Sequence, residues 1–101
     1  MTKIKTLIEE NTLKDELLEL IISNKGSDLY ITVGSYPAIK IGGSIMIIDK
    51  GYNKFTEDTT YEFALSLISE SQHKILLEKK NLDFSFTFNK RRFRANISFQ
   101  R

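Results

Sequence analysis

The chain has 101 residues, 41% hydrophobic and 28% charged, a balance that fits one ordinary globular domain and leaves no room for a second. It has no cysteine and a single histidine, His73, which excludes disulfides, thiolate metal sites and histidine-rich metal sites. No apolar run reaches the length of a signal peptide or a membrane span, so we expect a soluble cytoplasmic protein.

The charge is unevenly distributed along the chain. The formal net charge is +2, but residues 90–101 hold five basic side chains and no acid, which leaves −3 on residues 1–89. A basic segment on a mildly acidic body suits phosphate groups, nucleic acid or an acidic partner.

The first predicted element is a helix over residues 13–24, where apolar residues recur at helical spacing. Thr12 is the expected N-cap, and Gly26 is the expected stop after the last turn. Residues 1–12 are expected to be an N-terminal extension, with at most a short helix over residues 4–10.

Three strands are predicted next. Residues 28–33 alternate between apolar and polar side chains, as a half-buried strand does. Residues 38–41 and 44–48 form two more strands, joined by Gly42 and Gly43, which tolerate the positive φ angles of a tight hairpin.

Two helices follow, over residues 56–69 and 72–80. Thr56 can cap the first of them, and Phe55 just before it is placed as a hydrophobic staple. The buried stripe of the first helix is expected to be Tyr61, Ala64, Leu65 and Ile68.

The chain closes with a predicted β-hairpin. Residues 82–88 and 92–99 both alternate between apolar and polar side chains. A two-residue turn at residues 89–90 would place Phe86 opposite Phe93 and gather the apolar side chains on one face. The order of elements predicts an α+β domain with an antiparallel sheet of about five strands, an N-terminal helix and a central helix pair.

The other face of this hairpin carries the candidate functional residues. Arg92 and Arg94 are two positions apart on one strand and share that face, with Asp83 and Ser85 across from them. A guanidinium group is a planar, permanently charged fork that suits phosphate oxygens. The simpler interpretation is a solvated sheet face on which Asp83 pairs with the arginines.

The residues provide no catalytic set. The phosphate-binding motif G-x-x-x-x-G-K-[ST] is missing from the sequence, and His73 is interpreted as a surface or core-edge residue. We therefore expect no enzymatic activity, catalytic residue, metal or cofactor in these 101 residues alone.

Four segments, in order along the chain, resemble segments of the pilus and secretion ATPases. They are Gly26-Ser27-Asp28-Leu29-Tyr30-Ile31, Gly34-x-x-Pro37-x-Ile39-Lys40-Ile41-x-Gly43, Leu82-Asp83-Phe84-Ser85-Phe86 and Arg92-Phe93-Arg94-Ala95-Asn96-Ile97-Ser98-Phe99-Gln100-Arg101. They are similar to the family's A-S-D-L-H-L, G-x-P-P-x-x-R-x-x-G, x-D-F-S-F and R-F-R-V-N-x-x-x-Q-R. Tyr30 stands where the family has histidine, so the role of that position is open.

The resemblance, over residues 13–101, is to the PAS-like N-terminal domain of PilT-type type IV pilus retraction ATPases. It implies a regulatory and coupling domain of a hexameric motor for twitching motility, peripheral to the inner membrane. ATP and Mg²⁺ would be bound by a C-terminal RecA-like core, over which this domain closes while it contacts the adjacent subunit. Arg92, Arg94 and Arg101 would approach the ATP phosphates.

The same resemblance implies that the family's last N-terminal strand and its RecA-like core would follow Arg101. We therefore expect the isolated chain to expose a sheet edge and to be prone to dimerise. The pilus inner-membrane machinery would be a further partner, and nucleic acid would not be one.

Two functions from other classes of protein are alternatives to the motor domain. A stand-alone PAS-like sensor or interaction module would need an internal ligand cavity, which the phenylalanine-rich face does not favour. A nucleic-acid binder would need aromatic side chains beside the arginines, whereas they alternate to opposite faces. Within the family, an extension or secretion ATPase is the less favoured assignment, because the start of the chain is short.

Overall fold

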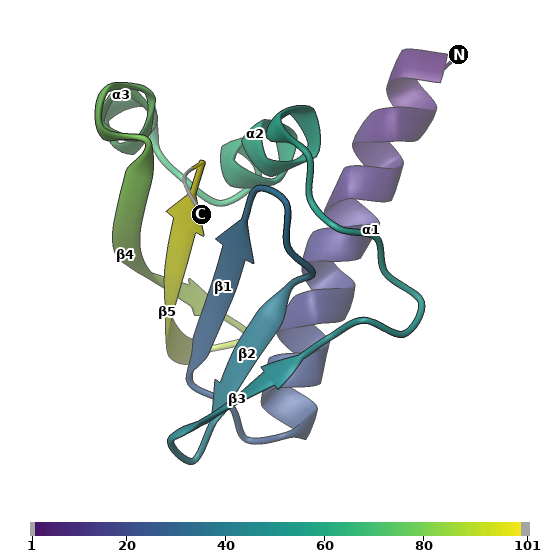
Figure 1. Cartoon of the computed structure of the whole chain (residues 1–101), viewed down its shortest axis with the longest axis vertical. Coiled ribbons are helices and arrows are strands. Elements are labelled where there is room, and N and C mark those ends of the chain that lie inside the picture. The colour runs from purple at the N-terminus through teal and green to yellow at the C-terminus, as the bar shows by residue number, and fades with distance from the viewer. Residues whose placement is uncertain (1, 100–101) are drawn as a thin grey trace.

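The structure, a computed structural model, describes the backbone of residues 2–99 and the side chains of residues 13–99. Three helices and five strands follow the predicted order, and the α+β class is confirmed (Figure 1). The elements are α1 (Thr2–Ser23), β1 (Asp28–Thr32), β2 (Ala38–Ile41), β3 (Ser44–Ile47), α2 (Glu57–Leu65), α3 (Glu70–Lys79), β4 (Asn81–Phe88) and β5 (Arg91–Ser98).

Helix α1 is longer than the predicted helix over residues 13–24. It runs without a break from Thr2 to Ser23, so Thr12 lies inside the helix and the prediction of an N-cap there is wrong. Neither proline nor glycine interrupts this stretch, and a threonine inside a helix costs only several tenths of a kcal/mol relative to alanine. A capping residue alone therefore does not start a helix when the preceding residues can also be helical.

The end of α1 is a Schellman motif that uses Lys25 in place of a glycine. The Lys25 N–H donates to the carbonyl of Ile22 at 3.1 Å, and the Gly26 N–H donates to that of Ile21 at 2.7 Å. Lys25 has the left-handed φ of 56°. A Cβ atom at Gly26 would lie 3.0 Å from the carbonyl oxygen of Lys40, a tight contact that a small shift of the backbone would have to relieve.

The sheet has the strand order β3-β2-β1-β5-β4, and it is mixed (Figure 1). The prediction of an antiparallel sheet is correct for every pair except β1 and β5, which run parallel with Leu29 beside Ala95. Parallel neighbours need a long crossover. The segment between β1 and β5 includes α2 and α3 and is long enough for such a crossover. The two strands can therefore run parallel.

The closing hairpin has the predicted register. Phe86 pairs with Phe93 and Phe88 with Arg91. The turn residues Asn89 and Lys90 have φ angles of 50° and 65°, as a two-residue type I′ turn requires. The predicted hairpin at Gly42 and Gly43, both with positive φ, is also confirmed.

Helix α2 begins at the predicted cap, and its buried residues differ in part from the predicted ones. Thr56 and Thr59 form a reciprocal capping box. Of the predicted stripe, Ala64 is buried and Ile68 is partly buried against the core, whereas Leu65 is 51% exposed. Thr60 and Phe63 are buried as well, although they were not predicted to be. The staple residue Phe55 helps to bury Phe63, because its ring packs edge-on against Phe63 at 5.5 Å between centroids. Helix α3 starts two residues before its predicted start, at the capping box of Ser69 and Gln72.

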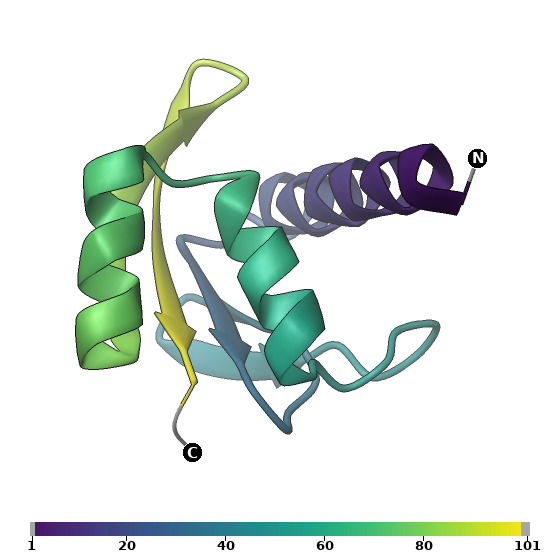
Figure 2. The same cartoon turned by 90° about the horizontal axis from the view of Figure 1, so that it is seen from above.

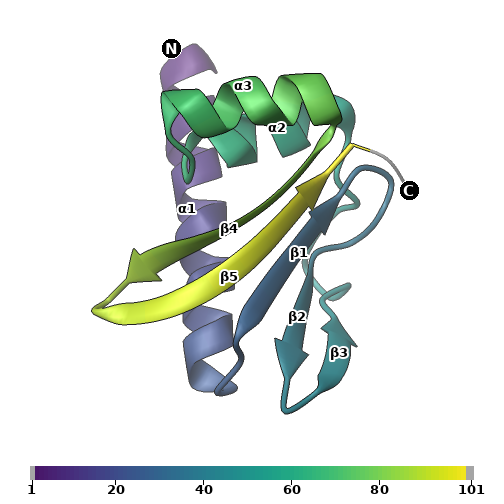
Figure 3. The ribbon, with the colours of Figure 1, turned by 90° about the vertical axis from the view of Figure 1, so that its left-hand side faces the viewer.

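The helices cover one face and one end of the sheet. Helix α2 lies between α1 and α3 (Figure 2). Leu17 and Ile21 of α1, Phe63 of α2 and Leu29 of β1 are fully buried in one core. Figure 3 looks onto the opposite face of the sheet, with α1 behind it and α2 and α3 along its upper end. In the described chain, no helix is long and apolar enough to cross a membrane.

Candidate functional site

Figure 3 shows the sheet face turned away from α1, which we call the open face. Polar side chains of several strands share this face. Cross-strand partners in a sheet point to the same side. Asp28 of β1 is the partner of Arg94 on β5 and of Lys40 on β2, and Tyr30 is the partner of Asn96. Residues 66 positions apart in sequence thus meet on this face.

Asp28 and Arg94 form the centre of the open face. The Nε and Nη2 atoms of Arg94 both donate to Oδ2 of Asp28, at 3.0 and 2.9 Å. The other carboxylate oxygen of Asp28 accepts a 2.6 Å hydrogen bond from the Ser27 hydroxyl. The carboxylate is 10% exposed and the arginine side chain 71% exposed, so a buried acid holds an arginine that faces solvent.

The charges of this pair stabilise each other. Burial acts to raise the pKa of Asp28, but the hydrogen bonds from Ser27 and Arg94 and the nearby positive charges outweigh it and lower that pKa below 3.8. The hydrogen bond to Asp28 and its negative charge raise the pKa of Arg94. Asp28 is therefore ionised at neutral pH and Arg94 is fully charged.

Arg92 lies beside Arg94 on the same face, as the sequence predicts. Its Nη1 atom donates to the hydroxyl of its cross-strand partner Thr87 at 3.1 Å. The two arginines form a basic stripe along β5. The third candidate, Arg101, lies outside the described residues.

Among the described residues, Asp83 makes no hydrogen bond or ion pair with an arginine, although its negative charge helps to raise the pKa of Arg94. Asp83 is opposite Asn96 in the ladder and accepts a 2.8 Å hydrogen bond from its side-chain amide. The carboxylate that holds Arg94 belongs to Asp28, which sequence reasoning missed as a site residue. Its signals were a polar position at the start of a half-buried strand and the aspartate that it shares with the family's A-S-D-L-H-L segment. Neither signal names Arg94 as its partner, because the β1–β5 pairing is not visible in the sequence.

A hollow of about 530 Å³ lies on the open face, and its lining includes Asp28, Tyr30 and Arg94. Tyr30, whose role the sequence left open, is half-buried there. The Arg94 side chain, which is 71% exposed, therefore borders an open hollow into which a ligand or another surface can enter.

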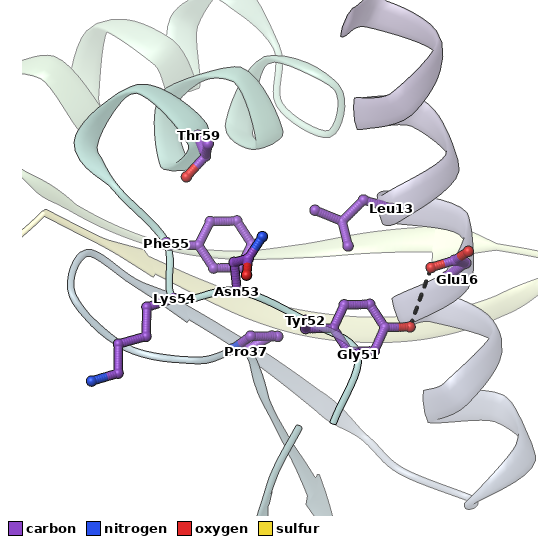
Figure 4. Close-up of a pocket in the computed structure, with 9 residues that line it drawn as sticks. All are labelled: Leu13, Glu16, Pro37, Gly51, Tyr52, Asn53, Lys54, Phe55 and Thr59. Carbon is purple, nitrogen blue, oxygen red and sulfur yellow. Dashed lines mark hydrogen bonds between the residues drawn. The ribbon is translucent and has the colours of Figure 1, made fainter. Parts of the chain in front are cut away.

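A second, smaller cleft of about 250 Å³ lies between α1, the loop before α2 and the start of α2 (Figure 4). The hydroxyl of Tyr52 donates to Glu16 of α1 at 3.3 Å and ties the loop to the helix. Burial and the neighbouring Glu16 carboxylate raise the pKa of Tyr52. Leu13, Pro37 and Phe55 line its apolar part.

His73 joins the two central helices. Its Nε2 atom lies 2.5 Å from the hydroxyl of Tyr61 on α2, and the two rings meet edge to face. This is the core-edge role that the sequence suggested. Within the described residues, no group of three or more acidic or histidine side chains is placed to hold a metal ion.

Comparison with known proteins finds relatives among the pilus ATPases. No family model matches the chain. The chain is 31% identical, over 88 residues, to the type IV pilus ATPase PilU of Pseudomonas aeruginosa, covering 86% of this chain and 22% of PilU. It also matches a crystal structure of the pilus retraction motor PilT with bound ADP, at a TM-score of 0.67 and 36% identity, covering 85% of this chain and 25% of that one.

The chain thus spans a quarter or less of the length of these two relatives. The likeness extends over both the helices and the mixed sheet, in sequence and in fold, and it confirms the family suggested by the four sequence segments. Sequence and fold together identify this chain as a counterpart of the N-terminal domain of PilT-type ATPases.

Proposed function

We propose that this chain is the regulatory and coupling domain of a hexameric type IV pilus retraction ATPase, and that its open face meets ATP held elsewhere in the complete protein. The observation that carries the proposal is the basic stripe of Arg92 and Arg94, in which Arg94 is held by a buried carboxylate yet 71% exposed. Arg101 is proposed as a third phosphate contact.

The chemistry of phosphoryl transfer explains why such arginines would matter. Charge spreads over the phosphate oxygens in the transition state, and a guanidinium group placed beside them stabilises that charge. The sequence has no G-x-x-x-x-G-K-[ST] motif, so in this proposal ATP and Mg²⁺ are bound by a RecA-like core of the complete protein. The ADP bound to the related PilT motor supports a nucleotide as the ligand.

The same proposal names the partners of the domain. The open face would pack over the chain's own core and on that of the adjacent subunit, so that domain closure couples hydrolysis to motion. The assembly would sit in the cytoplasm against the inner-membrane pilus machinery. Retraction is preferred over extension because the PilT structure is that of a retraction motor.

Two other functions are less well supported by the described residues. The two hollows described above are open to the surface, whereas a PAS-like sensor needs an enclosed ligand cavity. Phe86 and Phe93 are buried on the face opposite Arg92 and Arg94, so they cannot stack nucleic-acid bases beside those arginines.

The test is the substitution Arg94→Ala in the complete ATPase. We expect kcat for ATP hydrolysis to fall by about tenfold or more, because a charge that stabilises the transferring phosphoryl group is removed. Arg91→Ala is the matched control, since Arg91 is exposed on the same strand but points to the opposite face. Equal turnover in the two variants, with both folded, would refute the proposed role.

A further inference from the structure

We infer that Asp28 is a positioning residue for Arg94, which fixes the guanidinium group so that its free edge points outward to a phosphate. The inference rests on the proposed function, in which Arg94 meets the phosphates of ATP. It assigns a defined role to a carboxylate that the sequence did not single out and that does not itself touch the ligand.

The hydrogen bonds of Arg94 divide its guanidinium group into two edges. The inner edge, Nε and Nη2, donates to the single oxygen Oδ2 of Asp28. A guanidinium group has five N–H donors, so about three remain, two of them on Nη1. In the described part of the chain these have no acceptor, and they border the hollow on the open face.

Asp28 is itself held firmly in place. Its carboxylate is 10% exposed and accepts from Ser27 at 2.6 Å, and the Arg94 backbone N–H donates to the carbonyl of Ser27 at 3.2 Å. Two adjacent strands therefore fix both the carboxylate and the start of the arginine side chain. An arginine restrained in this way loses less rotamer freedom when it binds a phosphate.

Asp28 could instead compete with phosphate for Arg94, but the burial of the pair argues against it. If Arg94 turned away, the Asp28 carboxylate would stay buried with the Ser27 hydroxyl as its one side-chain hydrogen-bond partner among the described residues, and an unpaired buried charge is strongly unfavourable. The arginine would also retain three free donors without leaving Asp28. The contact is therefore compatible with phosphate binding and is maintained during it.

The experiment compares Asp28→Asn, Arg94→Ala and the double variant in the complete ATPase. We expect Asp28→Asn to lower kcat by several-fold, less than Arg94→Ala, and to have no further effect once Arg94 is alanine. This non-additivity is the signature of a residue that acts through Arg94, since independent effects would multiply. Asp49→Asn is the matched control, because Asp49 is an exposed carboxylate in the loop after β3 and does not line the hollow, and we expect it to keep wild-type activity.

A spectroscopic measurement on the 101-residue chain separates positioning from simple loss of fold. The Arg94 Nε–H signal should exchange slowly with solvent in the wild-type chain and rapidly in Asp28→Asn, with the backbone spectrum otherwise retained. Ser27→Ala keeps the Asp28 charge and provides a milder variant, with a smaller loss of kcat, if Asp28→Asn does not fold.

The outcomes distinguish the two proposals. Wild-type turnover in Arg94→Ala would overturn the proposed function. A loss in Arg94→Ala combined with wild-type or raised turnover in Asp28→Asn would overturn only the role of Asp28. A further loss on adding Asp28→Asn to Arg94→Ala would show a general structural role and would also overturn the inference.

Discussion

At the scale of single residues, Thr60 is a buried hydroxyl group that lowers the stability of the core. Its side chain is fully buried in α2, and Oγ1 has no hydrogen-bond partner among the described residues. Valine has nearly the same shape without the hydroxyl, so we expect Thr60→Val to raise the free energy of unfolding by about 1 kcal/mol. Urea unfolding measures this change.

The neighbouring Thr59 provides the contrast for that measurement. Its hydroxyl accepts the Thr56 N–H in the capping box of α2, so Thr59→Val should lower the free energy of unfolding by about 1 kcal/mol. The two substitutions make the same chemical change one residue apart. Destabilisation by both would mean that the Thr60 hydroxyl has a favourable partner.

The ionised carboxylate of Asp28 makes the free energy of unfolding depend on pH in the acidic range. Its pKa is lowered below 3.8 in the folded chain, so the folded state binds fewer protons than the unfolded state. The stabilisation is fully present above about pH 4 and is lost as the pH falls through the folded pKa. We expect the free energy of unfolding, from urea titrations at a series of pH values, to fall below pH ~4 more steeply in the wild-type chain than in Asp28→Asn.

Asp49→Asn is again the control, because Asp49 is exposed in the loop after β3 and its replacement leaves the contacts of Asp28 with Ser27 and Arg94 in place. It should retain the acid dependence that comes from Asp28. The same slope in Asp28→Asn as in the wild-type chain would contradict the assignment of this dependence to Asp28.

At the scale of elements, the hairpin turn between β4 and β5 holds two residues in the left-handed region. Asn89 tolerates this conformation, whereas Lys90, with φ of 65°, is strained by its Cβ atom. Lys90→Gly creates the Asn-Gly pair preferred by type I′ turns, and we expect a gain of about 1 kcal/mol in the free energy of unfolding. Thermal unfolding measures this gain. Lys90→Val provides the contrast, because it should lower the free energy of unfolding.

The elements also show what local sequence can and cannot predict. The register of β4 and β5 was predictable because one face must bury Phe86 and Phe93, and a slip of one residue would expose them. The parallel pairing of β1 with β5 was not, because it depends on how the two helices between them fold back. The placement of Arg92 and Arg94 on one face was predictable from the alternation within β5. The contact of Arg94 with Asp28 was not predictable, because it depends on the pairing of β1 with β5.

At the scale of the whole molecule, the part of the chain that is described presents two surfaces that other protein segments can reach. One is the open face with its basic stripe of Arg92 and Arg94. The other is the free edge of β3, which is one of the two end strands of the sheet (β4 is the other), where Ile45 and Ile47 are 52% and 57% exposed on the side of the open face. The first suits a charged ligand, and the second suits another β-strand.

We propose that the isolated chain associates weakly with a second copy through this edge of β3. An end strand presents unpaired backbone N–H and carbonyl groups, and pairing two copies of β3 would also bring their exposed isoleucines together. The strand has only four residues, so the association should be concentration-dependent. In sedimentation velocity, Ile45→Lys with Ile47→Lys should give a monomer at concentrations where the wild-type chain dimerises, while Leu65→Lys, at an equally exposed apolar position on α2, should not. A wild-type chain that stays monomeric at high concentration, or dimers that persist in the double variant, would contradict pairing through β3.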